Sequence, residues 1–337
     1  MATVPHPSVI AVTGARGALG RRVVASLERR GATVRAVDPA ADELKERLAG
    51  VDAIAHLSFA VGPELEDDEA AAVNVDRMVR VLDAAGALGL GQIVLSSSAA
   101  VYGAWPNNPV PLTEDAPVRP NPGFAFASQK AELERLAAEW ALDHPDARVC
   151  VLRPAVPLGE DDAGFLASAL AVRAPVATGE AEVPMQFVHV DDLAEAVAHA
   201  CVSRLDGVFN VSADGWLTAS AARALAGAPP RVQVPAWLLG RVQGWAWRWR
   251  LSRIPPGVQP YTQHSWVVAN DRLEATGWAP THSNEEAVVE TTDGMPWSRI
   301  TPKRRQELAL GASVAAIAGA ALGGAAIVRR ARRRRRR

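Results

Sequence analysis

A glycine-rich turn near the amino terminus constrains the fold of this chain more than any other feature. The segment TGARGALG places Gly14, Gly17 and Gly20 at three-residue intervals, after the apolar run 9–13 and before a helical pattern that ends at Arg30. Glycine permits a tight turn, and the N–H groups at the start of a helix attract phosphate. The order of strand, turn and helix therefore predicts a dinucleotide-binding unit.

The residues around the turn also indicate which dinucleotide binds. Asp38 ends the next apolar run, where its carboxylate can accept hydrogen bonds from ribose hydroxyls and repel a 2′-phosphate. NAD is therefore the expected cofactor. Arg16 lies inside the turn and could reach a phosphate, so NADP remains the alternative. We expect Arg16 and Leu19 to contact the cofactor together with the glycines.

Apolar, β-rich runs alternate with helical patterns over residues 8–153. The strand candidates are 9–13, 33–37, 53–57, 93–96 and 148–152. Such alternation is typical of a parallel sheet that is covered on both faces. The predicted fold class is α/β, a Rossmann-type doubly wound parallel sheet with a smaller mixed substrate domain, followed by a C-terminal hydrophobic segment and an arginine tail.

Composition changes beyond Arg153, where Pro and Trp become frequent. We predict a mainly dinucleotide-binding Rossmann domain over 1–153 and a mainly substrate-binding portion, interleaved with the sheet, over 154–295. In the latter, strand-like MQFVHV and GVFNVS flank a helix predicted from Asp192 to Cys201. The remaining predicted parts are a linker at 296–307, an apolar membrane-associating segment at 308–328 and an arginine-rich tail at 329–337.

The formal net charge of −1 conceals an uneven distribution. Eight of the 36 Lys and Arg residues stand in the last nine positions, so 28 remain against 37 acidic residues elsewhere. An acidic body repels phosphate chains, and nucleic acid is an unlikely partner on this ground. Cys150 and Cys201 both lie in apolar runs, which indicates buried thiols in a reducing cytoplasm. The amino terminus lacks the pattern of a secretory signal.

Five further segments carry motifs in a fixed order: GVDAIAHLS, NVDRMVRVLDAA, IVLSSSAAVYG, RPAVPLG and FVHVDDLAEAV. Together they resemble the extended short-chain dehydrogenase/reductase family, in particular its NAD-dependent epimerase/dehydratase branch, over about residues 8–285. The resemblance implies cofactor contacts in addition to those of the glycine turn and Asp38. They are His56, Leu57, Ser58, Asn74, Ser96, Lys130, Arg153 and Pro154.

The same resemblance exposes a missing catalytic group. In the family a tyrosine four residues before a lysine exchanges a proton with the substrate, a serine holds the reacting oxygen, and the lysine binds the nicotinamide ribose. The segment FAFASQKAELE keeps Lys130 but has Phe126 at the position of the tyrosine, and Ser98 corresponds to the serine. Losing a positioned acid or base lowers a rate by about 10²- to 10⁴-fold. We therefore expect impaired or altered acid/base chemistry.

Two residues are candidates to replace the phenol. Tyr102 follows Ser98 by four residues, in a loop at the carboxyl end of a strand, where open α/β sheets bind ligands. A structural role is the alternative, since family members carry this tyrosine alongside the catalytic one. His189 belongs to FVHVDDLA and is interpreted as a packing and hydrogen-bonding residue. No metal ligand is predicted.

A short connection indicates a second departure from the family. Only eleven residues separate Asp38 from Gly50, where the family has a further strand and an acidic adenine contact. We expect this outer strand to be absent. Its loss would expose the adenine side of the cofactor and weaken binding.

The segment WLLGRVQGWAWRWRLSRIPP leaves two interpretations open. It contains the aromatic residues Trp237, Trp245, Trp247 and Trp249 and the cations Arg241, Arg248, Arg250 and Arg253. The aromatics close a small core with arginines stacked over them, or they form a hydrophobic ligand pocket or membrane contact.

The C-terminal segment 308–328 has 21 uncharged residues and precedes RRARRRRRR. Its length suffices to cross a bilayer, but nine alanines and four glycines, including the Gly319 and Gly323 pair, make it weakly apolar. We expect a cytoplasmic body associated with an anionic membrane surface through 308–337, peripherally or as an atypical tail anchor. The alternative is a solvated, disordered tail.

Two function classes follow from these observations. The first is an NAD(P)-binding, epimerase/dehydratase-like oxidoreductase that acts on a small alcohol or carbonyl or on a sugar nucleotide. The second is a non-catalytic dinucleotide-binding sensor or scaffold near a membrane. A small-molecule substrate is the expected partner in the first, and a homodimer is compatible with both.

Overall fold

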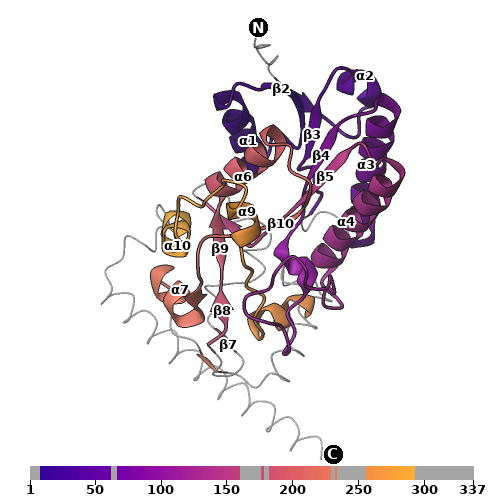
Figure 1. The fold of residues 1–337 in the computed structure, drawn as a ribbon. Helices are drawn as coiled ribbons and strands as arrows, with labels where there is room; N and C mark the ends of the chain where they lie inside the picture. Colours follow the sequence, from indigo (N-terminus) through magenta and orange to yellow (C-terminus); the bar gives the residue numbers. More distant parts are fainter. Residues whose placement is uncertain are drawn as a thin grey trace, which may run out of the picture.

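A six-stranded parallel sheet forms the centre of the molecule (Figure 1). The computed structural model describes residues 8–61, 67–159, 176–177, 182–228, 232–233 and 256–292. The sheet consists of β1 (Val9–Thr13), β2 (Thr33–Val37), β3 (Ala53–His56), β4 (Gln92–Ser96), β5 (Arg148–Pro154) and β10 (Gly207–Val211). The order is β10-β5-β4-β3-β1-β2, and all neighbours are parallel. The predicted doubly wound α/β class is confirmed.

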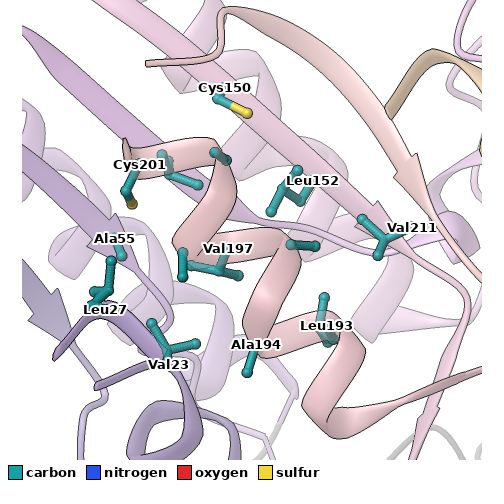
Figure 2. Packing of buried hydrophobic residues seen from close by; sticks show 14 of the residues in the cluster. Val23, Leu27, Ala55, Cys150, Leu152, Leu193, Ala194, Val197, Cys201 and Val211 are labelled. Atoms are coloured by element: carbon teal, nitrogen blue, oxygen red, sulfur yellow. The ribbon is translucent and has the colours of Figure 1, made fainter. Parts of the chain in front are cut away.

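Helices cover both faces of this sheet (Figure 1). One face carries α1 (Ala18–Arg29) and α6 (Val190–Val202), and the other carries α2 (Leu44–Leu48), α3 (Asp67–Leu88) and α4 (Ala125–Asp143). On the first face Leu27 of α1 and Val197 of α6 pack with Leu152 of β5 in one buried cluster (Figure 2). On the second face Met78 and Leu133 fill a corresponding cluster. Both faces are buried at the inner strands β3 and β4, which explains why these two strands are mostly apolar, whereas the edge strand β2 is partly exposed.

The chain reverses its direction across the sheet at β1. After β2 it crosses back over β1 to β3, so that β2 and β3 flank β1 on opposite sides. The connections that leave β1 and β3 therefore begin side by side at the carboxyl edge. Open α/β sheets bind ligands in the crevice at such a switch point.

Strand β2 is the edge of the sheet in the part of the chain that the structure describes. The short helix α2 occupies the connection from Asp38 to β3, and no further strand is present within residues 8–61. The predicted loss of the outer strand is therefore confirmed.

The later part of the chain combines small sheets with short helices. They include β6 (Val156–Leu158) parallel to β9 (Phe187–His189), β8 (Pro184–Met185) antiparallel to β11 (Leu217–Thr218), and β7 (Val176–Ala177) parallel to β12 (Val232–Gln233). The short helices of this part are α7 (Ala219–Leu225), η2 (Pro256–Thr262), α9 (Asp271–Glu274) and α10 (Asn284–Thr292). One further short helix, η1 (Ala99–Tyr102), follows β4 in the earlier part of the chain. Because α6 and β10 return to the central sheet, this region is interleaved with it.

The tryptophan-rich segment 237–249 and the C-terminal segment 296–337 lie outside the described residues. In the portions that are described, no helix has the length and apolar character needed to cross a membrane.

Gly20 is the tightest point of the glycine turn, which makes it a sensitive test of this packing. A Cβ atom at this buried position would lie 2.1 Å from the carbonyl oxygen of Gly14 and 2.7 Å from Cα of Ala15. Backbone atoms cannot move aside as a side chain can, so Gly20→Ala should lower the free energy of unfolding by about 2–3 kcal/mol in urea titrations.

Gly17→Ala is the matched control. Its Cβ would approach the same carbonyl oxygen only to 3.3 Å, and the loss should stay below about 1 kcal/mol. Equal losses in the two variants would show that the turn does not pack as described.

Candidate functional site

The glycine turn presents a helix N-terminus that no side chain caps. Gly14 has φ of +70°, and a Cβ there would lie 3.0 Å from the amide nitrogen of Ser58, so the turn lies directly against the loop after β3. Gly17 caps α1 without a side-chain hydrogen bond, and the first turn holds no acidic residue. Arg16 and Gly17 are exposed. An uncapped helix start, with its N–H groups and the positive end of the helix dipole, is suited to an anion.

Thr13 fixes the loop after β3 relative to the turn. Its hydroxyl oxygen accepts hydrogen bonds from the amides of Leu57 and Ser58 at 3.1 and 3.2 Å. With its oxygen so used, Thr13 donates its proton to Nδ1 of His56 at 3.0 Å. Burial, reinforced by the charges of Lys130 and Arg77, lowers the pKa of His56 to about 3. His56 is thus a neutral, buried support of the crevice.

Lys130 is a buried cation at the carboxyl edge of β4. Its Nζ donates to the carbonyl oxygen of Ser96 at 2.8 Å and lies 3.9 Å from the ring centre of Phe59. Burial lowers the pKa of Lys130 to about 7, although the nearby charge of Glu134 acts in the opposite direction. An amine whose pKa is near neutrality can hold or release a proton under cellular conditions.

Ser98 lies two residues beyond the end of β4 and caps the start of η1. Its hydroxyl oxygen accepts a hydrogen bond from the amide of Ala100 at 3.2 Å. Accepting this bond leaves the hydroxyl proton available for donation to another oxygen. Ser98 can therefore donate the hydrogen bond to a substrate oxygen that the family resemblance implies for it.

Phe126 is the residue that, by the sequence resemblance, is expected at the position of the family's tyrosine. The side chain stands in the first turn of α4, 5.5 Å from the ring of Phe59 in an edge-to-face arrangement and 5.7 Å from Phe124. It therefore belongs to an aromatic wall beside Lys130. A phenyl ring in this wall provides packing and no exchangeable proton.

Tyr102 is fully buried and its phenol is committed to structural hydrogen bonds. The hydroxyl donates to Oδ1 of Asn210 at 2.8 Å and accepts from Nη1 of Arg153 at 2.9 Å. Burial raises the pKa of Tyr102 despite the opposing charge of Arg153. This environment argues against the hypothesis that Tyr102 replaces the missing phenol, because its proton faces a buried amide.

Arg153 forms a buried ion pair that the sequence did not predict. Its Nη2 lies 2.6 Å from Oε2 of Glu134, and both side chains are less than a tenth exposed. The hydroxyl of Ser97 donates to the same carboxylate. Arg153 and the neighbouring Pro154 were expected at the cofactor, but the Arg153 guanidinium is engaged in this network. Glu134 could have been noticed, because it follows Lys130 by one helical turn.

Asn74 joins the loop after β3 to helix α4. Its amide oxygen accepts from the backbone nitrogen of Ala60 at 2.6 Å, and its amide nitrogen donates to the Ala60 carbonyl and to Gln129 at 2.9 Å each. This pattern orders the crevice wall. By contrast, Asp38 is exposed just after the edge strand β2, and its carboxylate accepts a hydrogen bond from the amide of Ala40 at 2.9 Å.

A pocket adjoins the site on the side of the later sheets. Its lining comes from the segments after β5, around β8, and around η2, and consists of Ala155, Val156, Val183, Pro184, Met185, Gln186, Phe187, Ala219, Tyr261, Thr262, Trp266 and Val267. Tyr261 connects the pocket to the crevice, because its hydroxyl donates to the carbonyl of Ala100 at 2.7 Å and its ring lies 5.0 Å from Phe124.

The sheet order, the open helix N-terminus and the lysine beneath an aromatic wall define a Rossmann-type α/β protein with a crevice at its switch point. The sequence model of the NAD dependent epimerase/dehydratase family matches residues 10–212. The chain belongs to this family.

Several known proteins resemble the chain over most of its length. An uncharacterized protein of Mycobacterium tuberculosis is 28% identical over 261 residues, which is 69% of each chain. The UDP-glucose 4-epimerase of Azospirillum brasilense is 27% identical and is matched over 88% of this chain and 93% of its own. The crystal structure of the Thermus thermophilus UDP-glucose 4-epimerase in complex with NAD has a TM-score of 0.63 at 22% identity, over 87% of this chain and 100% of that one. The structural likeness establishes a shared fold.

A substitution in the ion pair between Arg153 and Glu134 would test whether this pair stabilises the packing of α4 against β5. Glu134→Gln should lower the free energy of unfolding by about 3–5 kcal/mol, because it leaves a buried guanidinium without its counter-charge. Chemical unfolding followed by circular dichroism would measure the loss.

Glu132→Gln on the same helix serves as the control. Glu132 pairs with Arg135 at 2.6 Å, but both side chains are about half exposed, so the change should cost no more than about 1 kcal/mol. A small loss in both variants would mean that the buried pair does not hold the helix.

Proposed function

We propose that this chain binds a nicotinamide dinucleotide in the crevice and acts as an epimerase/dehydratase-like oxidoreductase on an alcohol or carbonyl group. The observation that carries the proposal is the uncapped N-terminus of α1, which opens at the same sheet edge as Ser98 and Lys130. When bound, the nicotinamide supplies the site that accepts and returns a hydride. Family membership supports this assignment.

Each predicted contact has a defined task under this proposal. The N–H groups after Gly17 would hold the pyrophosphate, with Arg16 and Leu19 at the rim. The exposed carboxylate of Asp38 would accept hydrogen bonds from the adenosine ribose and disfavour a 2′-phosphate, so NAD is preferred over NADP. Lys130 would bind the nicotinamide ribose. Because the outer strand is absent, the adenine is expected to be less covered than in the family at large.

Lys130 is also our candidate for the proton that a tyrosine would normally transfer. Phe126 has none to give, and Tyr102 directs its own to Asn210. The Lys130 amine uses one hydrogen bond on Ser96, and its pKa of about 7 suits proton exchange at neutral pH. Ser98 would donate to the reacting oxygen while Lys130, directly or through one water, holds the proton.

A sugar nucleotide is the substrate class that the relatives favour. The Azospirillum and Thermus proteins are named as UDP-glucose 4-epimerases, and the pocket beside Tyr261 lies where a substrate could extend from the crevice. We place the substrate-binding portion mainly in residues 154–295, interleaved with the sheet. A homodimer is compatible with this arrangement.

Phe126 favours one alternative, a dinucleotide-binding sensor or scaffold without catalysis. The aromatic wall of Phe59, Phe124 and Phe126 can shelter a bound nicotinamide without transferring a proton to a substrate. In this alternative, as in the first, the tail 308–337 would hold a cytoplasmic body at an anionic membrane. That localisation rests on the sequence alone.

The decisive experiment is a calorimetric titration of the full chain with NAD, NADH, NADP and NADPH in parallel. We expect NAD or NADH to bind more tightly than the phosphorylated forms, because Asp38 repels a 2′-phosphate. Gly17→Trp should abolish binding by filling the turn. If none of the four dinucleotides binds, both the enzyme and the sensor hypotheses are wrong.

Turnover then separates the two hypotheses. With NAD and UDP-glucose as the probe, an enzyme should form UDP-galactose at a rate that falls in Ser98→Ala and rises in Phe126→Tyr by about 10²-fold or more. Binding of NAD with no turnover in the wild type, and recovery in Phe126→Tyr only, would support the sensor.

The burial of Lys130 should make the free energy of unfolding depend on pH. The native pKa of about 7 lies below the ordinary 10.5, so the unfolded chain binds more protons between these values and wild-type stability should rise with pH across that window. Lys130→Met removes the buried charge and should raise the free energy of unfolding at pH 6 by about 2–4 kcal/mol.

The advantage of Lys130→Met over the wild type should shrink as the pH rises from 7 to 9. Urea titrations at pH 6, 7, 8 and 9 would measure it. An advantage that does not change with pH would show that Lys130 is not a desolvated cation in the native state.

A further inference from the structure

Three side chains with metal-binding atoms gather at the start of α6, apart from the glycine turn. His189 ends β9, His282 lies in the loop before α10, and Glu290 belongs to α10. One donor atom of each lies within 4.8 Å of the other two. Nε2 of His189 is 2.8 Å from Oε2 of Glu290, and the imidazole rings stack with centres 3.9 Å apart.

The His282 ring lies beside a buried carboxylate. Its Nδ1 lies 3.1 Å from Oδ2 of Asp192, which is 2% exposed. Asp192 also accepts hydrogen bonds from the amide of His282 at 2.9 Å and from the hydroxyl of Thr281 at 2.5 Å. Because the Thr281 hydroxyl donates its proton to Asp192, its oxygen can accept a hydrogen bond from Nδ1 of His282 at 3.1 Å, which leaves the lone pair on Nε2. Histidines that bind metals commonly donate from their other ring nitrogen to an oxygen acceptor in this way.

We propose that His189, His282 and Glu290 form a zinc-binding site. Two imidazoles and one carboxylate are a ligand set that Zn²⁺ accepts, with a water completing four-coordination. Zinc bonds of about 2.0–2.2 Å bring tetrahedral ligands to roughly 3.3 Å from one another, so the widest pair must close by about 1.5 Å.

The two outer ligands are free to make this movement. The side chains of His282 and Glu290 are 29% and 45% exposed, whereas that of His189 is 4% exposed. A rotation of the His282 ring out of the stack and a shift of the Glu290 carboxylate would converge on the buried Nε2 of His189. Their exposure also gives the ion a path from solvent.

Zinc binding requires a change of tautomer at His189. In the metal-free arrangement Nδ1 accepts from the amide of Asp191 at 3.3 Å, and Nε2 donates to Glu290. The ion takes the Nε2 lone pair, and the proton moves to Nδ1, where the Asp191 carboxylate is 3.8 Å away.

The site would act as a clasp between distant parts of the chain. His189 lies at the junction of β9 and α6, while Glu290 lies in the last helix that the structure describes, which packs against β9. An ion bound here stabilises the folded state by attaching α10 to that junction.

The test is calorimetric titration of the full chain with ZnCl₂ alone, at pH 7.5, after removal of metals with EDTA and exchange into buffer free of chelator. We expect one zinc ion per chain with micromolar or tighter affinity. Glu290→Gln keeps a hydrogen-bond acceptor for His189 but is a poor ligand, and it should weaken binding at least about 10-fold. His282→Asn should do the same.

His264→Asn is the matched control, because this partly exposed histidine lies outside the cluster. It should leave zinc affinity unchanged. Zinc should also raise the melting temperature of the wild type and of His264→Asn, but not of His282→Asn, and MgCl₂ should have no effect, since Mg²⁺ prefers oxygen ligands.

Two outcomes would overturn the site: no stoichiometric zinc binding by the wild type, or binding that is equally tight in Glu290→Gln and His282→Asn. Neither outcome bears on the dinucleotide titration, because the cluster shares no residue with the glycine turn.

Discussion

The buried ion pair between Arg153 and Glu134 holds the helix that carries the candidate site. It joins α4 to β5, and the same guanidinium donates to Tyr102 in η1. Lys130 stands one helical turn before Glu134, so the pair sets where its amine emerges at the end of β4. Breaking a buried pair of this kind strongly destabilises the folded state. The ion pair therefore also restricts the position of the Lys130 side chain.

Phe126 is part of an aromatic cluster beside this framework. Its ring packs with Phe59 and Phe124, and the ring of Phe59 lies 3.9 Å from the amine of the buried Lys130. Desolvation lowers the pKa of Lys130. Under the proposed function the two features are linked, because Phe126 packs against Phe59, and the ring of Phe59 lies over the desolvated amine that would exchange the proton.

The sequence predicted the sheet well and the site in part. Strands at 9–13 and 93–96 match the structure to within one residue because both faces of the sheet are buried there and the apolar runs are nearly unbroken. The glycine turn was recognisable because its spacing follows from backbone sterics. Tyr102 and Arg153 illustrate the limit: their place in the chain suggested the crevice, yet partners 108 and 19 residues away, Asn210 and Glu134, engage them elsewhere.

The sequence by itself determined the fold class, the glycine-rich turn before a helix and the phenylalanine at position 126, since each follows from local spacing or from the identity of one residue. Only the tertiary structure decided the ionisation of Lys130 and His56, and the meeting of His189 with His282 and Glu290. The reason is physical: burial and the proximity of charges depend on segments that are remote along the chain, and no local pattern specifies the distance between them.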